Sequence, residues 1–540
     1  MNTEPGYQPP GTFITHLIKN GFKRHGPVIT RDEFEIHNLD LTSLKLNVPH
    51  MLPFVVAKRF SSHETVTFDQ LEQVLPDLKS MAQSLQKGFI VLALGGRIQT
   101  DEMALKELGL SNIVVIDRAD IESVNAAPDL PTRSKLLSAT LVGPLGRERL
   151  SPYISGRPAI GGRFFGRSST LKRLIPGEHN WTVLGNRRIG KTSLLQEIMA
   201  RLKLQGVQTA WVYGGKCNST QDVVYDILCD LDQFRSAEHV VADLYKARNL
   251  PSYVHRIADS ENKNIALFID ELDHILEFDA KQNFEVLELL RATFQNHEAC
   301  RIFLAGFRQV MEASRSINHP LFNFTKPHEL ELFGRDETTD MITRPLSHMG
   351  IDLTGTDLPE AVYRQTAGHP ELIQIHCAEL IRLYEDRGGI PSGPELFGDV
   401  FNNEEYKRKV LETFLANTNP YEELLCYLLI KDAEQRGMSM QYEFSPEDVD
   451  RVLNGVGYNI GLREIGAIIT QLKVSGIITP IKGRNEKYRF SVPQLAGYCL
   501  RSNLDFSISK ALAAARSSGS DFQYWLDPEE TGGGGSKPNA

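Results

Sequence analysis

The central part of the chain contains short apolar runs that end in glycine or in charged residues. These runs lie at residues 182–184, 265–269 and 300–305. Runs of this length between turn residues are typical of strands that are buried on both faces of a parallel sheet. An apolar helical pattern begins at residue 191, directly after the loop that follows the first run. The pattern therefore predicts an α/β core in which strands alternate with helices.

Beyond this core the apolar positions recur with a helical period. Within residues 361–383 turn signals alternate with stripes of large apolar residues, among them Leu372, Ile375, Ile381 and Leu383. Stripes of this kind predict amphipathic helices. We expect a helical lid over residues 336–402.

Residues 403–505 combine a helical stripe with a hairpin pattern. Residues 462–474 predict an amphipathic helix whose inward side carries Leu462, Ile465, Ile469 and Leu472. Two short apolar runs at 477–481 and 487–492 flank the turn residues 482–485. A helix followed by such a hairpin predicts a winged helix, with the hairpin as its wing.

The N-terminal residues 1–125 predict a separate, small α/β domain. Strands are expected at residues 54–60, 89–94 and 113–117, and helices at 68–85 and 100–108. Residues 126–160 contain five prolines and several glycines, which predicts a linker. In the tail, residues 506–540, we expect a short helix and an acidic segment. The Gly-Gly-Gly-Gly-Ser run at 532–536 is typical of engineered flexible linkers and is excluded from the fold.

Composition and charge narrow the class of protein. The chain has 540 residues, of which 41% are hydrophobic and 24% are charged, as in soluble proteins of several domains. No run reaches the roughly 18 apolar residues of a membrane span, and the N-terminus lacks the pattern of a secretory signal. We therefore expect a cytoplasmic protein. The net charge of −9 argues against a protein coated by nucleic acid, although a local basic face stays open.

The loop after the first strand carries the pattern Gly-x-x-x-x-Gly-Lys-Thr. Its residues are Gly185, Asn186, Arg187, Arg188, Ile189, Gly190, Lys191, Thr192 and Ser193. The two glycines let successive backbone N–H groups point at one anion, and the helix that follows adds the positive end of its dipole. In such a loop Lys191 reaches the β- and γ-phosphates of ATP, and the Thr192 hydroxyl binds Mg²⁺. The alternative is an ordinary glycine turn before a helix.

Two carboxylates end the second predicted strand. Asp270 and Glu271 follow the apolar run 265–269, and the carboxyl ends of parallel strands border the ligand crevice of an open sheet. Asp270 suits a contact to Mg²⁺, and Glu271 is placed to orient and deprotonate the attacking water. By itself such a pair also fits the acidic first turn of a helix. Together with the upstream loop, the pair favours an Mg²⁺-dependent ATPase.

Four stretches resemble, in this order, the STAND branch of AAA+-like P-loop ATPases. They are residues 164–167, the loop 185–195, the pair Asp270 and Glu271, and residues 368–370. The resemblance covers residues 160–500 and implies a P-loop ATPase core over 161–335. It also implies slow ATP hydrolysis and a role in prokaryotic signalling, often in antiviral defence.

The resemblance further implies which residues surround the nucleotide. Phe165, Gly166 and Arg167 would lie along the adenine. Pro370 would pack near the base, and His369 would approach the phosphates. The family usually has acidic residues after Gly-Arg, whereas this chain has two serines and a threonine. If the resemblance is set aside, the sequence Gly-His-Pro also fits a turn that ends one helix before the next helix begins at Pro370.

A sensor residue is expected after the third strand. Arg308 is the candidate, because Ala305 and Gly306 carry no polar side chain. The alternative is a solvated arginine at the start of a helix. Arg187 and Arg188 fit a contact to phosphate or to a neighbouring subunit equally well.

The wing has a basic edge formed by Lys482, Arg484, Lys487 and Arg489. Such an edge can meet the phosphates of double-stranded DNA. It equally fits a solvated hairpin in a winged helix that docks on the ATPase.

The N-terminal domain is weakly similar to Mrr-type restriction endonucleases. That resemblance implies a metal site in which Asp40 and Lys58 are the first and last residues, but the carboxylate position between them is Val56. A side chain without oxygen cannot hold Mg²⁺. We expect no nuclease activity and favour a relic of the fold that binds DNA or protein.

Two functions remain open. The favoured one is an ATP-dependent switch that assembles into a homo-oligomer or with an effector protein. The alternative is a DNA-engaging ATPase, similar to replication initiators or transposition regulators, that assembles on duplex DNA through its winged helix.

Overall fold

The computed structural model describes most of the chain. The described residues are 10–31, 34–48, 52–60, 65–84, 89–98, 113–231, 249–261, 263–295, 297–415, 418–438, 442–481, 483–484 and 486–517. The expected helix at 100–108, Lys482 of the wing and the Gly/Ser run of the tail lie outside these residues.

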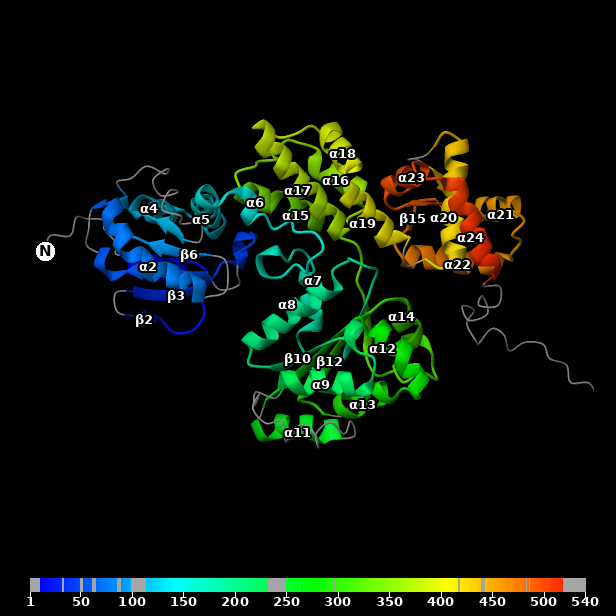
Figure 1. Ribbon diagram of the computed structural model, residues 1–540, viewed down its shortest axis with the longest axis horizontal. Helices are drawn as coiled ribbons and strands as arrows, with labels where there is room; N and C mark the ends of the chain where they lie inside the picture. Colours follow the sequence, from blue (N-terminus) through cyan, green and yellow to red (C-terminus); the bar gives the residue numbers. More distant parts are fainter. Residues whose placement is uncertain are drawn as a thin grey trace, which may run out of the picture. The chain divides into compact units, whose positions relative to one another are not determined.

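The chain forms two compact units, each described by itself. The first unit consists of residues 1–169, 334–360 and 374–396, and the second of residues 170–333, 361–373 and 397–540. Figure 1 shows the elements of both units with the labels used below. No helix within the described ranges is long and apolar enough to cross a membrane.

A mixed sheet forms the centre of the first unit. Its strands run in the order β1-β3-β4-β6-β8, and β2 pairs with β3. The strands β4, β6 and β8 are parallel, whereas β3 runs antiparallel to β4. Their bounds are Lys23–Arg24 for β1, Ile29–Arg31 for β2, Phe34–Asp40 for β3, Leu52–Ala57 for β4, Ile90–Ala93 for β6 and Ile113–Ile116 for β8.

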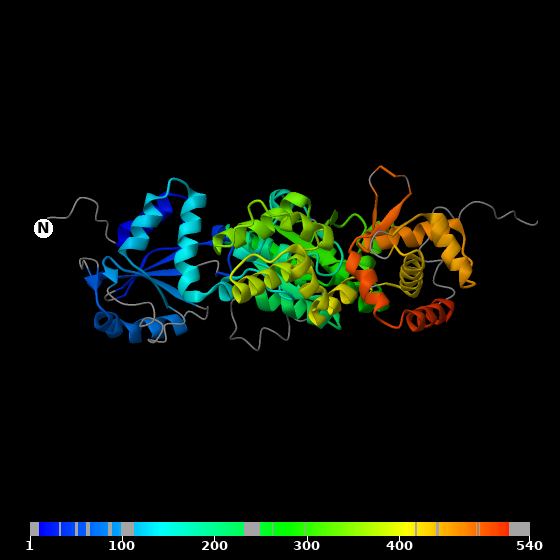
Figure 2. The same ribbon diagram turned by 90° about the horizontal axis from the view of Figure 1, so that it is seen from above.

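Helices cover both faces of this sheet. Apolar residues of α2 (Phe68–Ser84) share a buried cluster with one face, among them Leu71, Val74 and Leu78. The other layer contains α1 (Pro10–Lys19), α4 (Arg118–Ala126) and α5 (Leu130–Leu145), as Figure 2 shows. Burial on both faces explains why β4 and β6 consist of apolar residues without alternation. The predictions for β4, α2, β6 and β8 are confirmed, but the strands β1 to β3 and the helix α1 were not foreseen.

The predicted linker at residues 126–160 is wrong for its first half. The segment contains α5 and the short helix α6 (Arg147–Leu150). Asp129 caps α5 by accepting a hydrogen bond from the Thr132 N–H at 2.8 Å. Pro131 lies in the first turn of α5, where no N–H is needed, and Pro144 lies in its last turn. Two of the five prolines that suggested a linker therefore mark the two ends of a helix.

The second unit is built on a parallel sheet. The strand order is β10-β11-β12-β9-β13, and every pairing is parallel. The bounds are Trp181–Leu184 for β9, Gln208–Tyr213 for β10, Ile265–Asp270 for β11, Cys300–Gly306 for β12 and Lys326–Glu329 for β13. The three strands expected from the apolar runs are β9, β11 and β12. The α/β fold with a parallel core sheet is confirmed.

Both faces of this sheet are covered by helices. Helix α8 (Lys191–Leu204) packs on one face, where the rings of Phe268 and Phe303 stack at 4.9 Å. The other face shares a buried cluster with α9, α11, α12, α13 and α14. Their bounds are Thr220–Leu231 for α9, Leu250–Glu261 for α11, Leu272–Asp279 for α12, Glu285–Phe294 for α13 and Arg308–Arg315 for α14.

The predicted helical lid is present as α15 to α18. These helices span Arg335–His348, Leu358–Thr366, Pro370–Arg387 and Gly393–Asn402. The four stripe residues Leu372, Ile375, Ile381 and Leu383 are all buried, as the period of the sequence predicts.

A winged helix follows, as predicted. Helix α22 spans Leu462–Val474, and the strands β15 (Ile478–Pro480) and β16 (Tyr488–Phe490) form the antiparallel wing, visible in orange in Figure 2. A third strand, β14 (Glu443–Phe444), pairs with β16. The remaining helices are α19 (Glu404–Phe414), α20 (Pro420–Gln435), α21 (Pro446–Gly455), α23 (Pro493–Leu500) and α24 (Leu504–Ser517).

One inward position of α22 was predicted wrongly. Ile465, Ile469 and Leu472 are buried, but Leu462 is 76% exposed. Leu462 is the first residue of the helix. Its side chain therefore lies at the helix end, beyond the part of the stripe that packs on the core.

Candidate active site

The Gly-x-x-x-x-Gly-Lys-Thr loop joins β9 to α8 as the sequence predicts. Gly190 has a φ of 101°, a left-handed conformation that glycine adopts without strain, and α8 begins at the next residue. Lys191 Nζ donates hydrogen bonds to the carbonyl oxygens of Gly185 at 2.7 Å and Asn186 at 3.0 Å. Burial lowers the pKa of the Lys191 ammonium, against the opposing effect of the Asp270 carboxylate. The loop thus holds a desolvated cation at the start of a helix.

Thr192 and Asp270 meet although they are far apart in the sequence. The Thr192 hydroxyl donates a hydrogen bond to Asp270 Oδ2 at 2.6 Å. Asp270 is only 2% exposed, and burial raises the pKa of its carboxyl. A hydroxyl and a carboxylate are hard oxygen donors, which fits Mg²⁺, an ion that takes one or two protein carboxylates and keeps several waters. The two residues suit the metal role predicted for them.

Glu271 is held at the edge of the sheet by its neighbours. Its backbone has a φ of 54°, and its N–H donates to Asp270 Oδ1 at 3.0 Å. A Cβ on Gly214 would lie 2.4 Å from the Glu271 carbonyl oxygen, and one on Gly215 would lie 2.7 Å from Glu271 Oε2. Gly214 is therefore required for the approach of the Glu271 backbone to the end of β10, whereas a side chain at position 215 would displace only the tip of the Glu271 side chain.

Tyr213 is a site residue that the sequence did not reveal. It ends β10 directly beside Asp270 in the parallel register. Burial, and then a hydrogen bond to Glu271, raise the pKa of Tyr213 to about 12. The phenol is thus protonated at neutral pH and donates to the glutamate. The only sequence signal was an aromatic residue at the end of an apolar strand, before two glycines.

Asp273 was also missed. Its Oδ2 accepts a hydrogen bond from the Phe307 N–H at 2.8 Å, which satisfies a backbone donor where β12 turns into α14. A Cβ on Gly306 would lie 2.9 Å from this oxygen. Asp273, the second acidic residue after β11, therefore ties the end of β11 to the end of β12.

Arg308, the predicted sensor, is engaged by the winged-helix region. Its Nη2 lies 2.7 Å from Glu422 Oε2, and its Nη1 donates to Glu422 Oε1 at 2.9 Å. It also donates to the hydroxyl of Ser475. Arg308 is 12% exposed and Glu422 is fully buried. This ion pair links the start of α14 to the start of α20 within the second unit.

Two further residues of the loop contact the same region. The Asn186 side-chain amide donates to the carbonyl oxygen of Ser475. Arg188 lies 2.8 Å from Glu412 of α19 and 3.1 Å from the buried Glu371 of α17. Lys409 lies 3.4 Å from the same Glu371 carboxylate. The loop is therefore tied to three elements that follow the core. Arg187 is exposed, and its backbone N–H donates to Asn186 Oδ1 at 2.7 Å.

Gly368, His369 and Pro370 form the turn between α16 and α17. Gly368 has a φ of 77°, and a Cβ on it would lie 2.0 Å from the Phe333 carbonyl oxygen. The His369 ring is 1% exposed and packs edge-on against Phe414 at 5.8 Å, and Pro370 is the first residue of α17. The geometry matches the simple turn that we left open as an alternative.

The segment expected along the adenine belongs to the first unit. Phe165 is buried, and Lys45 Nζ lies 5.1 Å from the centre of its ring. Arg167 follows Gly166 with a φ of 60°, and its N–H donates to Glu337 Oε1 at 3.0 Å. The local contacts of Phe165, Gly166 and Arg167 thus join residues 45, 164–167 and 337 of that unit.

Asp40 and Lys58, which the resemblance to restriction endonucleases implies as the first and last residues of one metal site, do not meet in the N-terminal sheet. Asp40 ends β3 and Lys58 follows β4, and because these strands are antiparallel the two residues lie at opposite ends of their ladder. The ladder separates them by roughly 20 Å. Glu35, which pairs with Val56, is the acid near Lys58, with Oε1 4.0 Å from Nζ. Val56 leaves this position without a second carboxylate.

The described residues of the basic wing are partly paired. Arg484 forms an ion pair with Glu443, and Lys487 Nζ lies 3.7 Å from Asp448 Oδ2. Arg489 is exposed and has no ion pair within the described part of the chain. The wing is less available to an external anion than its composition suggests.

Comparison with known proteins identifies the core. Residues 177–312 match the AAA domain family, about a quarter of the chain. A comparison with curated proteins found no match.

Three archaeal proteins are among the solved structures to which this chain is similar. A Walker-type ATPase of Pyrococcus abyssi is 16% identical, with a TM-score of 0.48 over 65% of this chain and 100% of that protein. The ORC2 protein of Aeropyrum pernix, in ADPNP and ADP complexes, is 13% identical, with a TM-score of 0.44 over 68% of this chain and 98% of that protein. The ORC1 protein of Aeropyrum pernix in complex with DNA is 14% identical, with a TM-score of 0.33 over 65% of this chain and 94% of that protein.

The AAA match spans β9, the phosphate-binding loop, β11 with Asp270 and Glu271, and β12. It therefore covers the residues whose geometry was described above. The chain contains an AAA-type P-loop ATPase domain at residues 177–312.

Proposed function

We propose that this protein is an ATP-binding switch that hydrolyses ATP slowly and assembles with itself or with an effector protein. The observation that carries the proposal is the set of contacts between the phosphate-binding loop and the elements after the core. Asn186 and Arg188 of the loop bond to Ser475, Glu371 and Glu412. A triphosphate competes for the same loop cations, so its binding is coupled to the position of the winged helix.

The active-site residues have separate roles in this proposal. Lys191 leaves the carbonyl oxygens of its own loop and binds the β- and γ-phosphates, while Thr192 and Asp270 hold Mg²⁺. When bound, Mg²⁺ supplies charge neutralisation at the phosphates. Glu271 orients the attacking water and accepts its proton. Tyr213 positions Glu271 through its hydroxyl.

The Arg308–Glu422 ion pair also holds the winged-helix region against the core. It is bidentate and buried, and breaking one partner of such a pair costs about 3–5 kcal/mol. A transition that moves the winged helix away from the core therefore needs a compensating interaction. ATP binding or a partner supplies it. The resemblance to STAND ATPases makes prokaryotic signalling and antiviral defence the context that we propose.

The switch is tested by hydrogen exchange and native mass spectrometry on the full chain. Saturating Mg-ATP is expected to increase amide exchange in α20 and α22 and to shift the mass distribution to larger assemblies. Glu422→Gln is expected to increase this exchange without ATP. Glu423→Gln is the matched control, because Glu423 accepts a hydrogen bond from Tyr427 of its own helix. Unchanged exchange and mass in ATP-saturated protein would contradict the switch.

The alternative function is a DNA-engaging ATPase. Arg489 is exposed on the wing and has no ion pair among the described residues, which favours phosphate contact there. The DNA function requires duplex binding that weakens steeply between 50 and 200 mM salt, roughly a thousandfold for six phosphate contacts. It also requires weaker binding when Arg484, Lys487 and Arg489 are replaced together by alanine. If the protein does not bind duplex DNA at low salt, the switch is the one candidate function that remains.

A further inference from the structure

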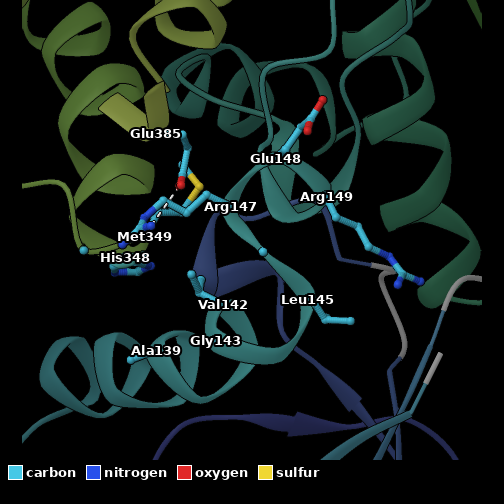
Figure 3. A pocket seen from close by; sticks show the side chains of 12 residues that line it. Ala139, Val142, Gly143, Leu145, Arg147, Glu148, Arg149, His348, Met349 and Glu385 are labelled. Carbon is cyan, nitrogen blue, oxygen red and sulfur yellow. Dashed lines mark hydrogen bonds and ion pairs between the residues drawn. The ribbon is translucent and has the colours of Figure 1, made fainter. Parts of the chain in front are cut away.

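A large cleft lies in the first unit, and no residue of the phosphate-binding loop lines it. Its volume is about 960 Å³, within the range of clefts that hold small organic molecules. Three separate stretches of the chain form it. The first runs from the end of α5 into α6, the second lies at the end of α15, and the third is one residue of α17. Figure 3 shows the side chains that line it.

One wall of the cleft is apolar and contains two glycines. Val142 and Leu145 of α5 lie on this side in Figure 3. Gly143 and Gly146 interrupt the wall, and a Cβ at either position would meet nothing within 4 Å. Exposed peptide faces between aliphatic side chains form a surface on which a flat ring can lie. The wall therefore suits a planar, largely apolar group.

Arg147 supplies a cation to the cleft. Its Nε donates to the Met349 carbonyl oxygen at 2.7 Å, and its Nη1 donates to Glu385 Oε1 at 2.8 Å. Its Nη2 has no hydrogen bond to any described residue and lies 3.6 Å from the position of a Cβ on Gly350. The guanidinium is thus fixed by two bonds and retains donors for an anion.

His348 supplies an acceptor on the same side of the cleft. Its Nδ1 lies 2.5 Å from the Leu44 carbonyl oxygen, and because a carbonyl only accepts, Nδ1 carries the proton. Burial also lowers the pKa of His348, which favours the neutral ring. Nε2 then carries a lone pair and accepts a hydrogen bond. Figure 3 shows His348 beside Arg147.

We propose that this cleft binds a small organic anion with a flat ring that bears an N–H donor. The anion pairs with Arg147, the N–H donates to His348, and the ring lies on the glycine-interrupted wall of α5. Nucleoside monophosphates and indole carboxylates share this chemistry. The ligand touches α5–α6 and the helices α15 and α17, so it joins the three stretches that form the first unit. The proposal does not depend on the ATPase, because the cleft and the loop share no residue.

The test is calorimetric titration of the full chain carrying Lys191→Ala, which weakens binding at the phosphate loop. The probes are AMP, GMP, CMP and UMP in one arm and indole-3-acetate in the other. We expect saturable binding of at least one probe at about one site per chain. The nucleoside that lacks the phosphate, or neutral 3-methylindole, is expected to bind at least roughly tenfold more weakly, because a charge-assisted bond is lost.

A larger side chain on the α5 wall tests whether the probe binds in this cleft. Gly143→Leu adds a side chain to the open wall, where a Cβ would meet nothing within 4 Å apart from its chain neighbours. Because Pro144 follows and disfavours a side chain before it in a helix, thermal denaturation of the variant and of the unmodified chain is compared before binding is measured. Gly143→Leu is expected to weaken binding of the probe by about tenfold or more. Gly398→Leu is the matched control, because Gly398 is an exposed glycine of α18 whose Cβ would also meet nothing within 4 Å. It is expected to leave binding unchanged.

Three results would overturn the proposal. The first is that no probe saturates below about 1 mM, the weak end of specific affinity. The second is that Gly143→Leu binds the probe as tightly as Gly398→Leu. The third is that the neutral analogue binds as tightly as the anion. Binding in one arm alone identifies the phosphate or the carboxylate as the natural anion and supports the proposal.

Discussion

The two sheets of this protein organise their polar residues in opposite ways. In the second unit all five strands are parallel, so the residues that follow β9, β10 and β11 come to one edge. Thr192 and Asp270 meet there at 2.6 Å. In the first unit β3 is antiparallel to β4, and this places Asp40 and Lys58 at opposite ends of the ladder. Strand direction, more than the presence of suitable residues, decides whether a site forms.

The two sheets also differ in how deeply their charged side chains are buried. Asp270 is 2% exposed, whereas the side chains of Glu35 and Lys58 are 36% and 43% exposed. A buried carboxylate has fixed partners and a shifted pKa, as at functional sites. An exposed pair is screened by water and contributes little. Five substitutions sharpen this comparison.

The largest effect is expected for Glu271→Gln in the parallel sheet. The glutamine cannot accept the proton of the attacking water, so ATP turnover is expected to fall roughly 100-fold or more. Affinity for ATP should remain nearly unchanged, because Glu271 does not hold phosphate. Steady-state hydrolysis and equilibrium binding measure the two quantities. Glu277→Gln on α12, the helix that follows Glu271, is the control. If both variants hydrolyse ATP at the same rate, Glu271 is not the base.

The next effect concerns stability and its dependence on pH. Burial raises the pKa of Asp270 above its ordinary value of 3.8. Its ionised form therefore destabilises the native state as pH rises through the raised pKa, and this cost disappears below the ordinary value. Asp270→Asn is expected to raise the free energy of unfolding by about 1 kcal/mol at pH 7. The difference from the unmodified chain should shrink as pH falls.

Asp40→Asn is the matched substitution in the mixed sheet. Asp40 has a side chain that is 22% exposed and accepts the Thr42 N–H at 2.9 Å. Its replacement is expected to change stability by less than about 0.5 kcal/mol. Chemical denaturation at pH 5 and pH 7 compares the two variants. A larger change for Asp40 than for Asp270 would break the contrast between the sheets.

A smaller effect is expected for Tyr213→Phe. The substitution removes the hydroxyl that donates to Glu271 and keeps the ring. A neutral hydrogen bond of this kind corresponds to roughly a two- to tenfold loss in kcat, with KM unchanged because Tyr213 positions the base and not the nucleotide. If KM rises while kcat stays constant, Tyr213 contributes to nucleotide binding and does not position Glu271.

The smallest effect is expected for Lys58→Ala in the mixed sheet. Its ion pair with Glu35 is long, at 4.0 Å, and exposed, so stability should change by less than about 0.5 kcal/mol. ATP turnover should not change. A loss of several kcal/mol in denaturation would show that this pair is structural.

The sequence predicted what depends on local pattern. The loop 185–193 was found because glycine, lysine and threonine have fixed spacing, and β11 was found from its unbroken apolar run. Helix α22 was predicted with its bounds from its apolar stripe.

The sequence could not predict what depends on pairing between distant segments. Tyr213 and Asp273 became site residues only through the register of β10, β11 and β12. The linker was misread because proline marks helix starts as well as turns. The contacts of Arg188 and Arg308 with glutamates more than a hundred residues away have no local signal.

The most direct measurement is calorimetric titration of Mg-ATP into the full chain and into Lys191→Ala. The loop geometry predicts saturable binding of about one ATP per chain, weakened at least roughly tenfold by Lys191→Ala because a charge-assisted contact is lost. If no ribonucleoside triphosphate binds in magnesium buffer, or if Lys191→Ala binds as tightly as the unmodified chain, the assignment of the loop to ATP is contradicted.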